Sequence, residues 1–457
     1  MKRDCIIITG SSGLIGSALA RRLEAQYEVI CFDREGAPHP PAECDCVNCD
    51  LTSDKSVQEA LRRVREHHCD RIASVIHLAA YYDFSGEPSP KYEEVTVRGA
   101  ERLLHGLKDF AVGQFVFSST MIVHAPCQPG ERINEDWPLE PKWDYPKSKV
   151  ETERLIHEHR GNLPTVMLRI AGVYDEGCHS IPLAHQMKRI YERELISYVF
   201  PGDASHGQSF LHLDDLEDAI CQVVERRADL PPQLVLLLGE AETLSYDELQ
   251  RAFGQLIHGE EWETQQIPKA LAKAGAWVHD NMPLMEEPFI KSWMIDLADD
   301  HFALDISRAK QTLGWEPKRS LRATLPEMVN RLKADPPAWY KDNRIDPPSE
   351  LEESAEDLDS EKSGLTPELK QTLMDVRSQR LEQVSPPEKT ARTAAWTAPR
   401  RGEEQRVAQV SQPAVSSSSQ SAGHLSLGQV AVSINQPVLH PALLGRRTPR
   451  SFSAPGC

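Results

Sequence analysis

The sequence of 457 residues has no apolar run long enough to cross a membrane, which takes about 20 predominantly apolar residues. Few apolar residues separate Met1-Lys2-Arg3 from Gly10, too few for the apolar region of a signal peptide. Positive charge is also scarce, because 51 Lys and Arg face 69 Asp and Glu, a formal net charge of −18. Such a field repels phosphate backbones and anionic lipids. We therefore expect a cytoplasmic protein that binds a small molecule and neither nucleic acid nor a membrane.

Matched cysteine pairs are missing as well. Cys44, Cys46 and Cys49 lie close together, but a closed zinc site needs four ligands and no second pair stands at a suitable spacing. We therefore expect no bound metal. With no secretory signal, the ten cysteines are interpreted as reduced thiols.

Aromatic residues almost vanish near the C-terminus, since residues 351–457 contain only Trp396 and Phe452. This region is rich in Ser, Pro, Glu, Gln and Arg, which favours disorder. We expect residues 346–457 to form an acidic, then Ser/Pro-rich disordered tail. A helix start at Thr366-Pro367-Glu368 leaves two interpretations open, a docking helix for an unknown partner or a marginal isolated helix.

What the sequence does contain is an alternation of short apolar runs and longer amphipathic segments. Strands are predicted at residues 6–8, 28–32, 74–78, 114–117, 165–169 and 234–238, and helices at residues 17–26, 88–110, 145–160, 183–194, 214–227 and 320–333. This alternation predicts an α/β fold with a doubly wound parallel sheet over residues 1–181. Residues 182–345 are expected to form a smaller lobe interleaved with the final sheet strands.

A glycine-rich turn follows the first predicted strand, with the sequence Thr9-Gly10-Ser11-Ser12-Gly13-Leu14-Ile15-Gly16. Glycines let the backbone approach a pyrophosphate, and the free N–H groups of the following helix stabilise its charge. Asp33 ends the second strand seventeen residues after Gly16, where a carboxylate can accept hydrogen bonds from an adenosine ribose. NAD is therefore the expected cofactor. NADP is the alternative, because Arg34 could reach its extra phosphate.

Further motifs follow in a consistent order: Asp50-Leu51, His77-Leu78-Ala79-Ala80, Phe117-Ser118-Ser119-Thr120, Tyr145-Pro146-Lys147-Ser148-Lys149, Leu168-Arg169-Ile170-Ala171-Gly172-Val173-Tyr174 and Phe210-Leu211-His212-Leu213-Asp214-Asp215. With the glycine turn, this order resembles the extended short-chain dehydrogenases, the NAD-dependent epimerase/dehydratase family, over residues 4–333. The resemblance implies a Rossmann-type fold. It places at the cofactor Gly10, Ser12, Gly13, Leu14, Ile15, Gly16, Asp33, Asp50, Leu51, Leu78, Ala79, Ala80, Tyr145 and Lys149.

Tyr145 and Lys149 stand four residues apart and share one face of the predicted helix. The Lys149 ammonium is expected to lower the pKa of the phenol, which is normally about 10. Tyr145 could then exchange a proton with an alcohol or ketone oxygen as hydride moves at the neighbouring carbon. The resemblance adds Thr120 as the catalytic hydroxyl and gives Lys149 a second role at the nicotinamide ribose.

Two departures from the family pattern bear on the substrate. Sugar-nucleotide epimerases commonly carry an Asn shortly after the strand arginine, but here Ile170, Ala171 and Gly172 follow Arg169. Met121 and Ile122 stand where sugar dehydratases carry an acidic pair. These changes disfavour a nucleotide sugar and dehydration, and leave epimerisation or net redox at an alcohol or ketone carbon.

A second class of function stays open at this point. The alternative is a non-catalytic dinucleotide-sensing regulatory or scaffold protein that acts through its tail. The presence of both Tyr145 and Lys149 favours an enzyme, because a sensor needs no tuned phenol. The resemblance further implies a homodimer formed by the helices of residues 88–110 and 145–160.

Overall fold

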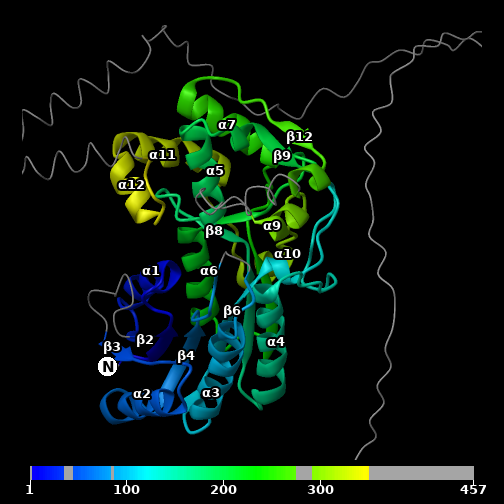
Figure 1. The fold of residues 1–457 in the computed structure, drawn as a ribbon. Coiled ribbons are helices and arrows are strands. Elements are labelled where there is room, and N and C mark those ends of the chain that lie inside the picture. Colours follow the sequence, from blue (N-terminus) through cyan, green and yellow to red (C-terminus); the bar gives the residue numbers. More distant parts are fainter. Residues whose placement is uncertain (1–2, 35–44, 84–86, 274–290, 349–457) are drawn as a thin grey trace, which may run out of the picture. The chain divides into compact units, whose positions relative to one another are not determined.

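The computed structural model describes residues 3–34, 45–83, 87–273 and 291–348 (Figure 1). The predicted tail from residue 349 on, with its candidate docking helix, lies outside the described residues. Within the described part, eight strands form one sheet in the order β11-β7-β6-β4-β1-β2-β3, with β5 beside β4. Its strands are β1 (Cys5–Thr9), β2 (Glu28–Asp33), β3 (Asp45–Asn48), β4 (Arg71–His77), β5 (Ala111–Val112), β6 (Phe115–Thr120), β7 (Thr165–Ile170) and β11 (Gln233–Leu238).

All the strand pairs of this sheet run parallel, which confirms the predicted fold class. Alternate side chains of a strand point to opposite faces. Ile6 and Ile8 accordingly pack in one hydrophobic cluster and Ile7 in another. Both faces of the sheet are thus covered, as a parallel sheet requires.

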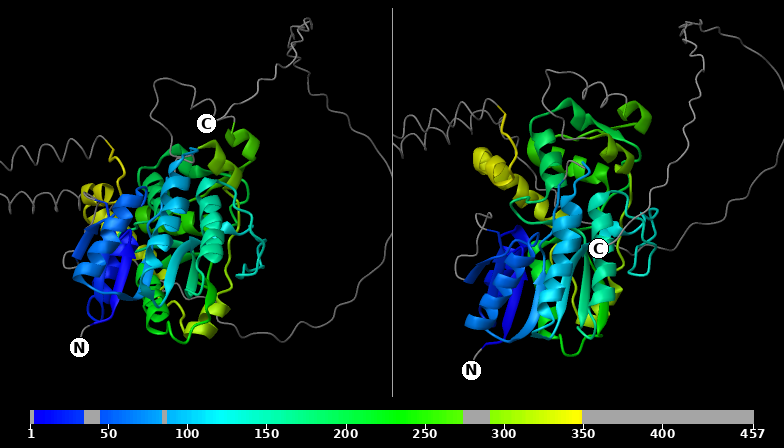
Figure 2. Two further views of the ribbon diagram at one scale, coloured as in Figure 1. Left: turned by 90° about the horizontal axis from the view of Figure 1, so that it is seen from below. Right: turned by 60° about the horizontal axis from the view of Figure 1, so that its bottom comes forward.

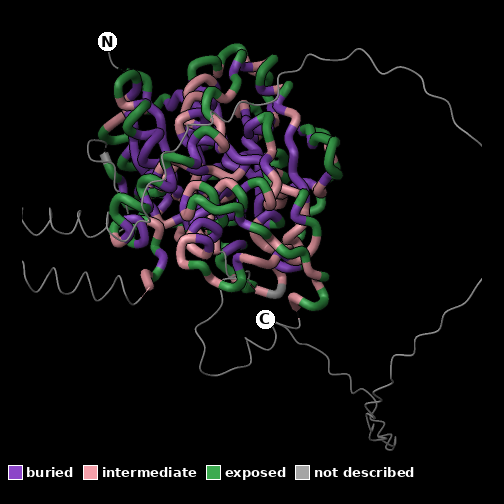
Figure 3. The backbone as a smooth tube through the Cα atoms, turned by 90° about the horizontal axis from the view of Figure 1, so that it is seen from above, coloured by how far each residue is buried: buried purple, intermediate pink, exposed green. Residues whose placement is uncertain are grey.

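Two layers of helices cover these faces (Figure 2). The cluster on one face contains residues of α1 (Leu14–Leu23), α6 (Leu213–Glu225) and α10 (Ser307–Leu313). The cluster on the other contains residues of α2 (Asp54–His67), α3 (Arg98–Leu107) and α4 (Asp144–His159). Buried residues gather in the interior and exposed residues at the periphery (Figure 3).

The strand order reverses between β1 and β4. From β1 the chain proceeds to β2 and β3 on one side, and then returns to place β4 on the other side of β1. Ligands of such sheets bind outside the carboxyl ends of the strands at this switch point. The topology therefore places a binding site beside Thr9, the last residue of β1.

A smaller lobe lies beyond the carboxyl edge of the sheet (Figure 1). It contains α5 (Ile181–Tyr191), α7 (Tyr246–His258), α9 (Ser292–Leu297), α11 (Leu321–Ala334) and α12 (Pro336–Asp342), with the parallel pairs β8 (Gly172–Tyr174) and β10 (Phe210–His212), and β9 (Val199–Pro201) and β12 (Gln265–Ile267). Helices α5, α7, α11 and α12 share a hydrophobic cluster of their own.

Three local expectations need correction. The segment predicted as one helix over residues 88–110 begins as a π-helix, Tyr92–Val97, before α3. The helix predicted over residues 320–333 is present as α11, but it is not the last helix of the described residues, because α12 begins at Pro336. Cys31, buried in β2, is disulfide-bonded. The prediction that all ten cysteines are reduced thiols is therefore wrong for Cys31. No helix among the described residues is long and apolar enough to span a membrane.

A buried carboxyl group joins the sheet to the lobe. Glu240 follows β11, is 4% exposed, and accepts a hydrogen bond from the Tyr174 hydroxyl at 2.7 Å. Its second oxygen accepts the backbone N–H of Leu321 at 2.9 Å, at the start of α11. Burial raises the pKa of Glu240 to about 7. The folded protein therefore holds a proton that the unfolded chain releases at lower pH.

We expect this proton to make stability depend on pH. Between about pH 4.5 and pH 7 the folded state binds more protons at Glu240 than the unfolded state, so the free energy of unfolding falls as pH rises. Glu240→Gln removes this titration. The free energy of unfolding that wild type loses between these pH values, up to about 3 kcal/mol, should then no longer be lost. Urea unfolding at several pH values measures it. Glu242→Gln, at a more exposed carboxylate paired with Arg322, is the control. Equal pH slopes for wild type and Glu240→Gln would contradict the assignment.

Candidate active site

The glycine turn at the end of β1 is shaped by close backbone contacts. Gly10 has a φ of +70°, a region that side chains rarely adopt, and a Cβ there would lie 2.8 Å from the Ala79 nitrogen. A Cβ at Gly16 would overlap the carbonyl oxygen of Gly10. At Gly13 only that oxygen lies within 4 Å, at 3.4 Å. Gly10 and Gly16 are thus required by the close packing of the turn, whereas the position beside Gly13 has space for another group.

The start of α1 fits a pyrophosphate. Gly13 is its N-cap and provides no side-chain capping hydrogen bond, and the first turn holds no acidic residue. The N–H groups of a helix's first turn have no partner within the helix. The N–H groups of Leu14 and Ile15 therefore lie at the carboxyl edge of the sheet, beside Gly13. The positive end of the helix dipole attracts an anion to this place.

Asp33 ends β2 beside this turn. One carboxylate oxygen accepts the Ser12 N–H at 2.8 Å and the other accepts the Arg34 N–H at 2.8 Å. A carboxylate oxygen has two lone pairs, so each retains capacity for a ribose hydroxyl. Asp33 thus helps to fold the glycine turn and also fits the ribose role that its spacing predicts. The side chain of Arg34 is exposed.

Asp50 and Leu51 follow β3 and precede α2. The Asp50 carboxylate accepts hydrogen bonds from the N–H and the hydroxyl of Thr52, at 2.9 and 2.8 Å, and these bonds lower its pKa. Leu51 is buried. The structure thus places both residues at the carboxyl edge next to β2, in a turn held by Asp50.

The end of β4 is bonded to the end of β1. The Thr9 hydroxyl accepts the Ala79 N–H at 3.3 Å and lies 2.7 Å from His77 Nδ1. The Leu78 N–H donates to the Thr9 carbonyl at 3.2 Å. These bonds hold Leu78, Ala79 and Ala80 beside the glycine turn, where the resemblance places cofactor contacts.

His77 is fully buried, and burial lowers its pKa to about 3. Its ring packs near those of Phe115 and Phe117, at centroid distances of 5.8 and 5.9 Å. Because the Thr9 hydroxyl accepts the Ala79 N–H, its own hydrogen is available for His77 Nδ1. His77 is therefore a neutral structural residue rather than a base.

The proposed catalytic pair lies on α4 at the same edge. Lys149 is 2% exposed, and its ammonium donates to the Ser118 carbonyl of β6 at 2.7 Å. The ammonium lies 5.6 Å from the centroid of the Tyr145 ring and 4.9 Å from that of Phe117. Thr120 is the buried last residue of the same strand. The structure thus brings Tyr145 and Lys149 together, with Lys149 bonded to the strand that ends in Thr120.

The ionisation of this pair differs from the expectation. Burial raises the pKa of Tyr145, and the neighbouring Tyr92 raises it further. Burial also lowers the pKa of Lys149 to about 7, although the Glu153 carboxylate opposes this. The predicted lowering of the Tyr145 pKa by Lys149 is therefore not found, because the loss of solvation acts on both groups and removes part of the lysine's charge near pH 7. Tyr145 is a neutral phenol, able to donate a proton.

Glu153 was not singled out from the sequence. It lies one turn after Lys149 on α4 and accepts hydrogen bonds from Arg169 of β7, at 2.7 and 3.1 Å, and from the Ser119 hydroxyl of β6. Tyr145, Lys149 and Glu153 recur every four residues, a periodicity that could have indicated a third residue on this face. One carboxylate thus joins the helix to both strands.

One set of possible metal ligands lies outside this site. Glu176, His212 and Asp214 place one ligand atom each within 4.8 Å of one another. However, His212 Nδ1 accepts the Asp214 N–H at 3.1 Å, and only Nε2 faces Glu176. Arg319 contacts both carboxylates, at 2.9 and 2.7 Å. These residues form an ion-pair cluster rather than a metal centre. Of the cysteines considered for zinc, Cys44 lies outside the described residues.

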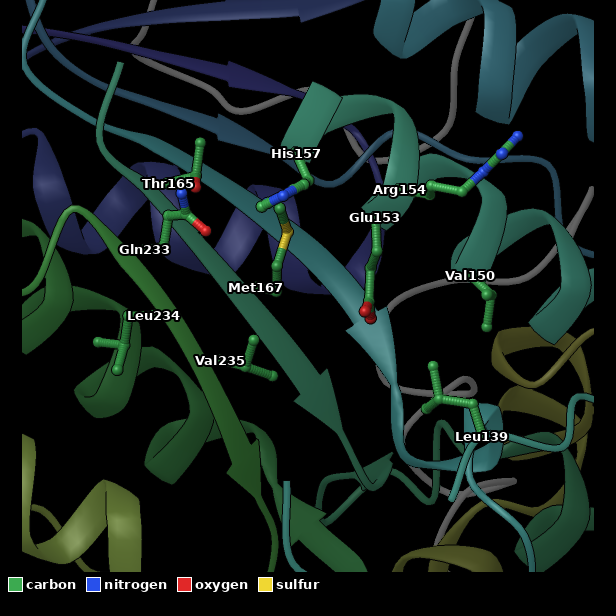
Figure 4. Close-up of a pocket in the computed structure, with 10 residues that line it drawn as sticks. All are labelled: Leu139, Val150, Glu153, Arg154, His157, Thr165, Met167, Gln233, Leu234 and Val235. Atoms are coloured by element: carbon green, nitrogen blue, oxygen red, sulfur yellow. The ribbon is translucent and has the colours of Figure 1, made fainter. Parts of the chain in front are cut away.

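A separate groove lies between α4 and the strands β7 and β11 (Figure 4). Val150, Met167 and Val235 supply apolar lining, and Glu153 and His157 add polar groups. It includes the first residues of β7 and β11 and therefore extends towards the amino ends of the strands. This groove is distinct from the site at the carboxyl edge.

The fold and the glycine turn define a dinucleotide-binding protein with a doubly wound sheet. The chain belongs to the NAD dependent epimerase/dehydratase family, whose model matches residues 6–239. The expectations of this family, of an enzyme and of NAD as its cofactor are thereby confirmed.

Three similar proteins illustrate the range of the family. The chain is 27% identical over 292 residues to UDP-glucuronate 4-epimerase of Thermodesulfobacterium geofontis, covering 62% of this chain and 77% of that protein. It is 23% identical over 356 residues to 3β-hydroxysteroid dehydrogenase/Δ5→4-isomerase of Mycobacterium tuberculosis, covering 71% and 89%. The crystal structure of Thermus thermophilus UDP-glucose 4-epimerase with NAD matches with a TM-score of 0.55 at 22% identity, over 72% of this chain and 99% of that one. The last likeness concerns the fold.

Proposed function

We propose that this enzyme transfers hydride between NAD and an alcohol or ketone carbon, with Tyr145 as the acid-base and Lys149 and Thr120 as its partners. The observation that carries the proposal is the placement of Lys149. Burying an ammonium group without a hydrogen-bonded carboxylate is unfavourable, yet Lys149 is 2% exposed and lies 5.6 Å from the centroid of the Tyr145 ring. A sensor would have no use for this arrangement.

Each residue of the site has a distinct chemical role. NAD, when bound, supplies the acceptor or donor of hydride. The neutral Tyr145 phenol donates its proton to a carbonyl oxygen and becomes a phenolate. In the reverse direction the phenolate takes the proton of an alcohol. A protonated Lys149 stabilises the phenolate that remains after donation. The Thr120 hydroxyl hydrogen-bonds the substrate oxygen as its charge develops.

Relatives support both outcomes of this chemistry. Those named as epimerases support a reaction in which a transient ketone is reduced again, while the one named as a hydroxysteroid dehydrogenase supports net redox. Dehydration is not proposed, because Met121 and Ile122 follow Thr120 in place of an acidic pair.

Isotopic labelling tests hydride transfer directly. A substrate alcohol carrying deuterium on the reacting carbon is incubated with the full chain and NAD. Hydride transfer should move the deuterium to the cofactor, or return it to the same carbon of an epimerised product. Deuterium released into water would indicate proton abstraction from carbon and would overturn the proposal. NAD binding is measured separately by calorimetry, and a failure to bind would overturn it as well.

A further inference from the structure

Three aromatic side chains gather around the proposed acid-base. Tyr82 meets the Tyr145 ring edge-on, with centroids 4.7 Å apart, and Trp143 lies at 5.4 Å. Trp293 packs against Trp143 at 4.9 Å. We call Tyr82, Trp143 and Trp293 the aromatic wall. Its members come from the loop after β4, the residue before α4 and helix α9, so the tertiary fold brings them together.

Hydrogen bonds hold both residues next to Tyr82. The Tyr81 N–H donates to the Thr96 hydroxyl oxygen at 3.0 Å, and the Tyr92 hydroxyl donates to the Asp83 carbonyl at 3.1 Å. Tyr82 itself is 45% exposed. A large aromatic ring between two hydrogen-bonded neighbours thus stays partly open to solvent beside Tyr145, where an incoming molecule can cover it.

The other two members are also joined across the site. Lys142, next to Trp143, donates to both carboxylate oxygens of Asp300 at 2.8 Å. Asp300 follows α9, which carries Trp293. This ion pair connects the segment before α4 with the lobe, so the two indole rings are positioned relative to each other.

The charges of the lobe do not favour a pyrophosphate. Many of its described cations already contact carboxylates: Lys188 with Glu192 and Glu194, Arg193 with Glu260, Arg251 with Asp247, Lys269 with Asp299, Lys273 with Asp296, Arg319 with Glu176 and Asp214, and Arg322 with Glu242 and Glu248. A doubly charged phosphate group would compete with these acids, within a chain whose net charge is −18.

Gly172 adds a steric argument. It lies in the stretch after Arg169 where sugar-nucleotide epimerases commonly carry an Asn. A Cβ at this position would lie 2.8 Å from the Phe210 ring. The Phe210 ring therefore fills the space that an asparagine side chain at position 172 would need.

Building on the acid-base role proposed for Tyr145, we infer that the aromatic wall selects the substrate, and that this substrate is an uncharged alcohol or ketone on an apolar ring body. Flat apolar surfaces gain most from contact with aromatic rings, both by leaving water and by ring stacking. The reacting oxygen would point at Tyr145 while the ring body covers Tyr82 and Trp143.

Binding and turnover are measured with the full chain in the presence of NAD. The probes are a 3-hydroxysteroid, the corresponding 3-ketosteroid and UDP-glucose, with tryptophan fluorescence as the binding signal. Trp143→Ala and Tyr82→Ala should each raise the steroid Kd roughly tenfold, by loss of apolar contact. Trp143→Phe and Tyr82→Phe retain a ring and should stay near wild type. Trp143 makes no side-chain capping hydrogen bond, so its replacement removes no hydrogen bond from the start of α4.

The outcomes separate the two proposals. Steroid binding that weakens in the alanine variants and survives in the phenylalanine variants supports the inference. UDP-glucose binding more tightly than the steroids, or steroid binding that ignores the alanine substitutions, overturns it. Turnover tests the role of Tyr145 separately. A steroid that binds through the aromatic wall without being oxidised or reduced would contradict the proposed function. The inference about binding at the wall would still hold.

Discussion

Replacing Tyr145 with phenylalanine is expected to lower kcat by about 10²- to 10⁴-fold, the usual contribution of a positioned general acid or base. The variant keeps the ring that packs against Tyr82 and Trp143, so substrate and NAD should bind nearly as before. Only the hydroxyl group, with its exchangeable proton, is removed. Steady-state kinetics with calorimetry of NAD binding measures both quantities.

The matched control is Tyr191→Phe, a half-buried tyrosine of α5 in the lobe. It should leave kcat within about twofold of wild type, since surface substitutions away from special contacts change little. A Tyr145→Phe enzyme of unchanged kcat would remove the phenol from the reaction. A parallel loss of NAD binding would instead assign Tyr145 to cofactor contact.

Gly16→Ala is expected to damage both stability and NAD binding. The new Cβ would overlap the Gly10 carbonyl oxygen and approach the Ser11 Cα, and neither backbone atom can move without opening the turn. Overpacking of this kind costs about 1–3 kcal/mol of unfolding free energy. The displaced turn would no longer present its N–H groups to a pyrophosphate. Thermal unfolding with and without NAD measures both effects.

Gly13→Ala separates those effects. Its Cβ would meet only the Gly10 oxygen, at an ordinary 3.4 Å, and its φ of −79° suits alanine. Stability should change by less than about 1 kcal/mol. NAD affinity should still fall, because the methyl group enters the space at the start of α1 where the pyrophosphate is expected. If both variants bind NAD like wild type, the pyrophosphate does not lie at this turn.

The sheet was predictable because its strands carry a local signal. Runs such as Ile6-Ile7-Ile8 are apolar on both faces, which is typical of a strand between two helical layers, and the glycine turn adds the order of strand and helix. Strands β8, β9, β10 and β12 have three residues each, too few to show a period, and were not predicted. The π-helix at Tyr92–Val97 likewise has no distinct spacing in the sequence.

The site was predictable where its chemistry is local. Tyr145 and Lys149 lie one helical turn apart, and Asp33 stands at a fixed distance from the glycines. The partners of Glu153 were not predictable, because Ser119 and Arg169 lie on different strands. The pKa shift of Tyr145 was predicted with the wrong sign for a similar reason. Its pKa is raised by burial and then by the electrostatic effect of Tyr92, which is distant in sequence.

The carboxylate of Glu153 binds one helix to two strands, and this constrains how the enzyme can diversify. A sliding or rotation of α4 would break the bonds to Ser119 and Arg169 at the same time as it displaced Lys149. Mutations that alter the reacting groups through this helix are therefore heavily penalised. Trp293, by contrast, belongs to α9 of the lobe, outside that network. Substitutions at Trp293 can therefore change the aromatic wall without disturbing the bonds that hold α4 to the sheet.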